Sequence, residues 1–121
     1  MNLRGLVLVA LWAALCGCSA PATAGPDNAR AAAQLERGAA ALRAMDCARC
    51  HGRHYAGWAA PSLLAAVRDG PRERFDHFVL EGDAVRGMPG YRSQPRVVQD
   101  LDAIYAYLRA CAEPPLSRCP R

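Results

Sequence analysis

The 121-residue sequence contains no lysine: all 15 of its basic side chains belong to arginine. These arginines are scattered along the chain, and the formal net charge is only +4. A nucleic-acid-binding surface needs cations gathered on one face, so we expect no nucleic-acid partner. Two interpretations of the arginines stay open: a patch that steers an acidic partner, and an ordinary solvated surface.

The sequence also lacks an apolar run long enough for a permanent membrane helix. The run at residues 6–15 follows Arg4 and has the length of the apolar part of a secretory signal. Two alternatives remain for how this segment ends. It is cleaved after Ala22-Thr23-Ala24, or it is a lipoprotein signal in which Cys18 carries a lipid anchor. We therefore expect residues 1–24 to be a signal peptide or a lipoprotein signal plus tether. The mature chain is then periplasmic, either lipid-anchored or soluble.

One short motif carries most of the chemistry. Cys47-Ala48-Arg49-Cys50-His51 has the pattern C-x-x-C-H, by which a c-type haem is attached to protein. Each thiol can add to a haem vinyl group, and the adjacent histidine can bind the iron through a ring nitrogen. Two intervening residues hold the sulfurs one helical turn apart. The motif therefore predicts one covalent haem c on Cys47, Cys50 and His51.

Three other interpretations of the motif are open. A thioredoxin-type redox pair would need a βαβ pattern, and none is visible in the sequence. A zinc site made by Cys47, Cys50, His51 and His54 would crowd all four ligands into eight residues, whereas structural zinc sites usually join separate segments. A structural disulfide between Cys47 and Cys50 is the third alternative.

Met88 is the candidate for a second axial ligand. It lies in the predicted loop 82–91, between Gly87 and Pro89, where it has no helical face to pack on. Without the haem motif it would be interpreted as a gap-filling side chain. With the motif, its thioether is predicted to bind the iron. His77 is an alternative ligand or, more simply, a surface histidine.

Apolar periodicity predicts about four helices and no strands. The expected helices cover residues 28–46 (capped by Asp27 or Asn28), 61–69, 72–81 and 93–110 (capped by Ser93). In the first, an apolar stripe is expected, and Gly38 should weaken the helix unless another backbone crosses there. The stripe is formed by Leu35, Ala39, Leu42 and Met45.

Two further features concern loops and the tail. Residues 52–60 should form a loop, in which Tyr55 and Trp58 either pack on the haem or belong to the ordinary core. The tail from about residue 112 is rich in proline and should be irregular. Cys111 and Cys119 are left over in an oxidising compartment, so we predict that they form a disulfide that pins the tail to the last helix.

Taken together, these parts resemble a small single-domain monohaem cytochrome c, over about residues 28–110. The resemblance implies an all-α cytochrome c-like fold around the haem in residues 25–121, and Pro61 as the residue that buttresses His51. It implies Met88 as the sixth ligand and Tyr107-Leu108 on a last helix that crosses the first. Family members usually carry an aromatic residue where this chain has Arg43, so the helix contact should differ in detail, with Ala39 and Leu42 as close-approach residues.

The resemblance implies a one-electron carrier and not an enzyme, although such a chain can be a subunit of a dehydrogenase or oxidase complex. With His51 and Met88 on the iron, no axial position is open to a substrate. A labile sixth ligand would instead give a gas-binding or catalytic haem subunit, which is the alternative.

A narrower resemblance concerns the redox partners. Residues 78–83, 87–89 and 102–108 are similar to cytochromes that accept electrons from PQQ-dependent alcohol dehydrogenases. This similarity suggests such a dehydrogenase as the electron donor. A terminal oxidase or another cytochrome would be the acceptor.

Overall fold

The computed structural model describes residues 25–113 and residue 119, and this part of the chain is helical, without strands. The predicted export segment and most of the predicted tail lie outside the described residues. The expected all-α fold is confirmed. Within the described ranges, no helix has both the length and the apolar character needed to cross a membrane. The elements are α1 (Pro26–Ala44), α2 (Ala48–His51), α3 (Leu63–Asp69), α4 (Arg72–Glu81), the 3-10 turn η1 (Ala84–Arg86), α5 (Pro95–Gln99) and α6 (Leu101–Ala112).

The first helix starts slightly earlier than the sequence predicts. Gly25 is its N-cap and Pro26 lies in its first turn, so neither Asp27 nor Asn28 caps it. Proline suits this position because its missing N–H would have no partner there. After the helix, Asp46 adopts a positive φ of 51° and turns the chain into α2. Aspartate tolerates this left-handed backbone better than most residues.

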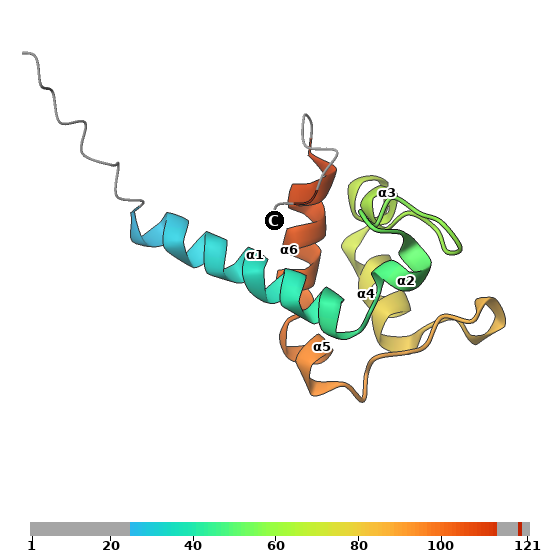
Figure 1. Ribbon diagram of the computed structural model, residues 1–121. Helices are drawn as coiled ribbons and strands as arrows, with labels where there is room; N and C mark the ends of the chain where they lie inside the picture. The colour runs from blue at the N-terminus through green and yellow to red at the C-terminus, as the bar shows by residue number, and fades with distance from the viewer. Residues whose placement is uncertain (1–24, 114–118, 120–121) are drawn as a thin grey trace, which may run out of the picture.

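The two long helices α1 and α6 cross in close contact (Figure 1). Gly38 lies at the crossing: a Cβ placed there would overlap the Ala103 carbonyl oxygen and come within 2.9 Å of the Ile104 nitrogen. Gly38 was expected to weaken the helix unless another backbone crosses there, and the backbone of α6 does cross there. Ala39 and Leu42, the expected close-approach residues, are both buried beside this crossing.

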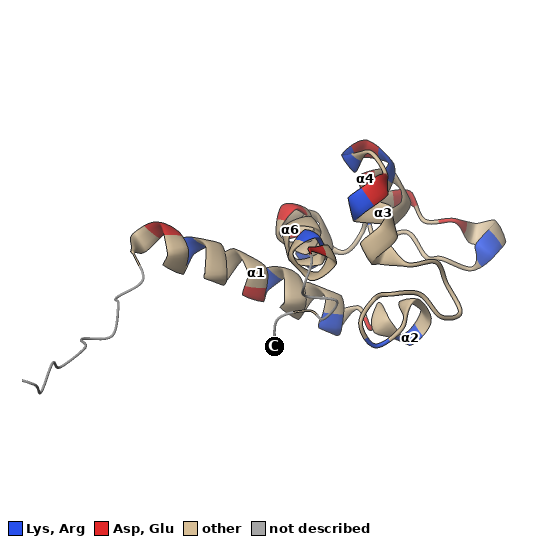
Figure 2. Ribbon diagram, turned by 90° about the horizontal axis from the view of Figure 1, so that it is seen from above, with Lys and Arg blue, Asp and Glu red and all other residues tan. Residues whose placement is uncertain are grey.

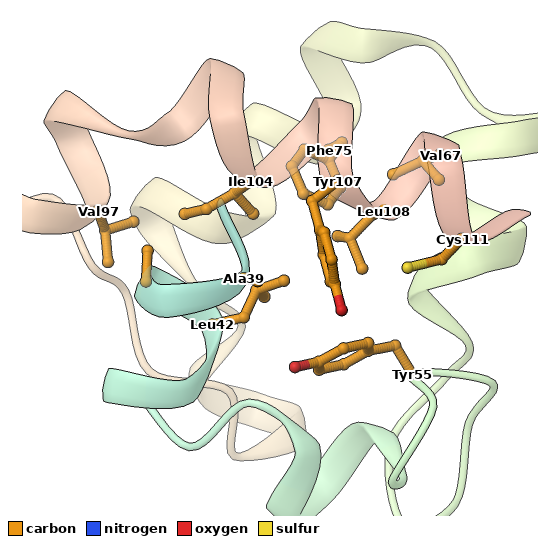
Figure 3. Close-up of a cluster of buried hydrophobic side chains, with 11 residues drawn as sticks. Ala39, Leu42, Tyr55, Val67, Phe75, Val97, Ile104, Tyr107, Leu108 and Cys111 are labelled. Carbon is orange, nitrogen blue, oxygen red and sulfur yellow. The ribbon is translucent and has the colours of Figure 1, made fainter. Parts of the chain in front are cut away.

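The core lies where α1 and α6 meet α3 and α4. Leu108 is fully buried at its centre, and Figure 3 shows the Tyr107 side chain pointing toward Tyr55. Burial of such side chains contributes about 1.5–3 kcal/mol each. The buried cluster is made by Ala39, Ala41, Leu42, Tyr55, Val67, Phe75, Val97, Ile104, Tyr107, Leu108 and Cys111.

Polar contacts fix α3 and α4 against α6. The Val67 carbonyl, in α3, accepts hydrogen bonds from the Tyr105 hydroxyl at 3.3 Å and from Arg109 Nη1 at 3.0 Å. Arg72, at the start of α4, pairs with Asp102 of α6 at 2.6 Å and stacks over the Tyr105 ring at 4.4 Å. These contacts hold the two shorter helices on one side of α6, across from α1 (Figure 1).

The predicted helix 93–110 is interrupted, which corrects the expectation of one continuous element. Residues 95–99 form α5, Asp100 leaves helical geometry with ψ of 14°, and α6 then begins. Gln94, and not Ser93, is the N-cap of α5. Aspartate has low helix propensity, and here its carboxylate pairs with Arg37 of α1 at 3.3 Å, so the break coincides with a contact between helices.

The predicted disulfide between Cys111 and Cys119 is present. Cys111 is fully buried at the end of α6 and belongs to the core cluster. Residue 119 is thereby fixed to the last helix, as the sequence predicts.

Candidate functional site

A cavity of about 270 Å³ lies between the helical core and two loops. Its wall is mostly apolar and includes side chains from α1, α4, α5 and α6. The four predicted site residues also lie on this wall: Cys47, Cys50, His51 and Met88. The structure therefore brings together a motif and a methionine that are far apart in the sequence.

The C-x-x-C-H motif forms a single helical turn, α2. The His51 N–H donates to the Cys47 carbonyl at 3.1 Å, which closes the turn and places both thiols along it. Cys47 is half-buried, Cys50 is exposed, and neither forms a disulfide. The backbone of the motif therefore folds as predicted, with the two cysteines one helical turn apart.

The loop 52–60 folds back on this turn and fixes it. The Ala60 N–H donates to the Cys50 carbonyl at 2.9 Å, and the Gly57 N–H donates to the His51 carbonyl at 2.9 Å. Gly52 and Gly57 have φ of 84° and 100°, which other residues rarely adopt. The loop thus depends on these two glycines to return to α2.

His51 is 8% exposed and its ring is held by one hydrogen bond. Its Nδ1 lies 2.7 Å from the Pro61 carbonyl oxygen. A carbonyl oxygen accepts only, so Nδ1 carries the proton and Nε2 keeps a free lone pair. This is the tautomer in which a histidine can bind a metal, with a carbonyl as the outer partner that orients the ring.

Met88 is presented by a loop closed by backbone hydrogen bonds. Asp83 and Met88 exchange two N–H···O bonds of 2.9 Å, and the Tyr91 N–H donates to the Val79 carbonyl at 3.0 Å. The ends of the loop pass each other so closely that a Cβ on Gly90 would lie 2.7 Å from the Glu81 carbonyl oxygen. These backbone contacts therefore fix the loop that carries Met88.

The properties of Cys47 argue against a thioredoxin-type pair. Burial, as the largest cause, raises the pKa of its thiol from 9.0 to about 11, and the neighbouring Asp46 and Cys50 act in the same direction. Redox-active C-x-x-C pairs have lowered thiol pKa values instead. The disulfide alternative is also not observed, since both thiols are free.

The zinc alternative finds no support in the geometry. In residues 25–113 and 119, no three side chains of the His, Cys, Asp and Glu types gather closely enough to hold a metal ion. His54 is exposed in the loop after α2.

Three aromatic candidates lie away from the cavity wall. Tyr55 is buried in the core, and Trp58 is 80% exposed. The core interpretation therefore holds for Tyr55 and is excluded for Trp58, whose packing on a haem stays a prediction. His77 is exposed and makes an edge contact with the Phe78 ring, so the surface interpretation holds for it.

Sequence reasoning did not identify Tyr91 and Arg86 as parts of the site. Both lie on the cavity wall. Burial raises the pKa of Tyr91, and Cys47 and Cys50 raise it further because they lie near its hydroxyl. The signal that could have identified them is their closeness to Met88, since both residues lie within three positions of it in the sequence.

The chemistry of this wall fits a haem c. Two unpaired thiols lie on one helical turn, an imidazole has a free Nε2, and a thioether comes from another loop, all around an apolar space. Histidine and methionine are the axial ligands of cytochromes c. The residues present are thus those that such a group needs.

Comparison with known proteins gives one match. Residues 33–108 match the family model described as cytochrome c oxidase, cbb3-type, subunit III. No curated protein matches the chain, and no solved structure matches it. The match begins in α1, ends in α6 and includes the C-x-x-C-H turn and the Met88 loop. The chain therefore belongs to this family of cytochrome c domains, which supports a haem-based role in electron transfer.

Proposed function

We propose that the chain is an exported c-type cytochrome that carries one electron at a time on a single haem c, with thioether bonds to Cys47 and Cys50 and axial ligands His51 and Met88. The observation that carries this proposal is the shared cavity wall, on which the motif and Met88 lie together. A haem bound here supplies one-electron chemistry through its iron, which cycles between the ferric and ferrous states.

The residues of the chain have separate tasks in this proposal. The hydrogen bond from His51 Nδ1 to the Pro61 carbonyl orients the imidazole and keeps Nε2 available. The Met88 thioether favours the ferrous state and gives a higher potential than a second histidine. The apolar side chains of α1, α4 and α6 exclude water from the space between these ligands.

The setting in the cell is part of the proposal. Covalent attachment of this kind and a disulfide between Cys111 and Cys119 both suit an exported protein in an oxidising compartment. We propose the periplasm, with residues 1–24 as a signal peptide or as a lipoprotein signal that leaves a lipid on Cys18.

The partners proposed are redox proteins. The narrow resemblance to acceptors of PQQ-dependent alcohol dehydrogenases supports such an enzyme as donor. The oxidase named in the description of the matched family supports a terminal oxidase, or a cytochrome that serves one, as acceptor. The chain acts either as a free shuttle or as a fixed subunit of such a complex.

The proposal is tested by co-expressing the full chain with a cytochrome c maturation system and measuring haem after denaturing extraction. We expect one covalent haem per chain and a reversible one-electron titration. Covalent haem that binds carbon monoxide in the native ferrous protein would instead favour a gas-binding or catalytic subunit. A chain that carries no covalent haem would contradict the proposal.

A further inference from the structure

The loop that carries Met88 is attached at its far end to the last turn of α4. The Tyr91 N–H donates to the Val79 carbonyl at 3.0 Å. The next N–H along the chain, that of Arg92, donates to the Leu80 carbonyl at 3.0 Å. The last carbonyls of a helix have no partner within the helix, so the returning chain supplies donors that the end of α4 lacks. We call these two contacts the neck of the Met88 loop.

An ion pair between side chains spans the same neck. Arg92 Nε donates to Glu81 Oε1 at 2.7 Å, and Arg92 Nη2 contacts the same oxygen. Glu81 is the last residue of α4, and Arg92 directly follows the loop. The pair therefore joins the residues on either side of the segment 82–91.

Glu81 is unfavourable for α4 alone. The C-terminal end of a helix carries partial negative charge, which repels a carboxylate and attracts a cation. The last turn of α4 contains no basic residue. Arg92 supplies a cation from outside the helix, and it does so only while the neck is closed.

The loop beyond the neck has contacts of its own. Asp83 and Met88 exchange two backbone hydrogen bonds of 2.9 Å, and the Asp83 carboxylate pairs with Arg86 at 2.7 Å. Figure 2 shows acidic and basic positions on this loop, beyond α4. Because these contacts join loop residues to one another, they would persist if the neck opened and the loop moved as one unit.

We propose that Arg92 and Glu81 are positioning residues for Met88, and that their ion pair keeps the loop closed so that the thioether stays on the iron of a bound haem. This inference rests on the proposed function, because it takes Met88 as the sixth ligand. A methionine ligand favours the ferrous state, so its bond to ferric iron is the weaker one and depends more on the loop. The ion pair therefore acts mainly in the ferric protein.

Replacement of the thioether by imidazole measures how readily the loop opens. In the ferric haem-loaded chain, the iron–sulfur bond breaks, an iron–nitrogen bond to imidazole forms, and no electron is transferred. At saturating imidazole, the rate observed by stopped flow is limited by the departure of Met88. We expect Arg92→Gln to raise this limiting rate about two- to fivefold, which is the effect of losing one exposed ion pair.

Glu81→Gln separates the ion pair from a simple effect of charge. This variant breaks the same pair but removes a charge of the opposite sign. A charge that acted through space on the iron would therefore change the rate in opposite directions in the two variants. We expect both single variants to raise the rate, and the double variant to raise it no further than either one. Arg92→Lys keeps the positive charge and should fall between Arg92→Gln and the wild type.

Two further measurements separate positioning from general stability. Arg68→Gln is the matched control, because Arg68 and Asp69 form an exposed ion pair at 2.7 Å that closes no loop. It should leave the limiting rate unchanged. Hydrogen exchange of the amides of residues 91 and 92 should be faster in Arg92→Gln, while the free energy of unfolding changes no more than in the control.

Three results would count against this account. The inference is overturned if Arg92→Gln and Glu81→Gln have the wild-type limiting rate, or if they change it in opposite directions. It is also overturned if Arg68→Gln raises the rate as much as they do, because general stability would then set the rate. If the wild-type rate instead rises with imidazole without limit, Met88 does not occupy the iron, and the proposed ligation fails.

Discussion

The crossing of α1 and α6 and the loop side of the cavity are built by different means. At the crossing, Gly38 lets two backbones meet and Leu108 is fully buried, so side-chain packing holds the contact. On the loop side, α2 and the Met88 loop are held by backbone hydrogen bonds and by glycines. The first region is a hydrophobic core, and a few of its side chains, Leu108 among them, also line the cavity. The second positions donor atoms around a space, and in our account a haem fills that space.

This difference gives the two regions different sensitivities. Changes at the crossing should alter the free energy of unfolding and leave haem attachment and potential nearly unchanged. Changes on the loop side should alter the haem and affect the polypeptide's own packing much less.

The largest effect is expected for the motif thiols. Replacing both, by Cys47→Ser and Cys50→Ser, removes the atoms that form the thioether bonds, so covalent haem should fall to zero. Haem staining of a denaturing gel and the mass of the intact chain measure this. The matched control is Cys111→Ser with Cys119→Ser, which removes the other cysteine pair and should keep the haem. Equal haem content in the two double variants would contradict the assignment.

A change at the helix crossing should act on stability alone. Gly38→Val places atoms where the Ala103 backbone already lies, so the helices must separate, at a cost of about 3 kcal/mol or more. Urea unfolding of the haem-loaded protein measures the loss. Ala32→Val, on an exposed part of α1, is the control and should cost well under 1 kcal/mol. The division between regions would fail if Gly38→Val shifted the reduction potential as much as changes in the Met88 loop do.

Met88→Ala tests the loop side directly. Loss of the thioether should lower the reduction potential by about 0.1 V or more, within the ~0.8 V range that axial ligands span. It should also let the ferrous protein bind carbon monoxide. The control is Met45→Leu, another methionine of the cavity wall, which lies just after α1 and should keep the potential and exclude carbon monoxide. A Met88→Ala protein with an unchanged spectrum would remove Met88 from the ligand set.

Reduction of the disulfide between Cys111 and Cys119 tests how much the end of α6 depends on it. The bridge closes a short loop, with a sequence separation of 8, so its loss should cost about 2 kcal/mol. The free energy of unfolding in urea, measured with the disulfide intact and with the disulfide reduced, gives this value. With the haem iron kept ferrous in both samples, the visible spectrum should stay the same, and a change in it would connect the tail to the site.

The smallest effect concerns the thiols before haem is attached. In the folded state the pKa of Cys47 is raised to about 11, so its thiol is half ionised near pH 11 instead of near pH 9. At neutral pH the thiolate fraction falls about 100-fold, and the greater nucleophilicity of the more basic thiolate offsets about tenfold of this, so alkylation by iodoacetamide should be about tenfold slower than that of an unfolded reference peptide. Peptide mapping of the haem-free protein measures the rate, with Cys50 as an internal comparison. Cys47 alkylation with an inflection near pH 9 would show that its thiol is not shielded.

The sequence was informative where chemistry or periodicity is local. The C-x-x-C-H turn, the bounds of α4 and the disulfide were all predicted from residues near one another. The break at Asp100 was not, because it coincides with an ion pair to Arg37 on a distant helix. The exposure of Trp58 likewise depends on how the loop folds back on α2. Tyr91 joined the cavity wall through a backbone hydrogen bond to Val79, which no pattern in the sequence specifies.

The most direct test of the central claim is a visible spectrum of the exported full chain, oxidised and reduced, with and without carbon monoxide, after denaturing extraction of loose haem. Our account predicts a covalent, low-spin haem whose reduced spectrum carbon monoxide leaves unchanged, because His51 and Met88 occupy both axial positions. A reduced spectrum that carbon monoxide alters would contradict the ligation by Met88. The absence of covalent haem would contradict the whole account.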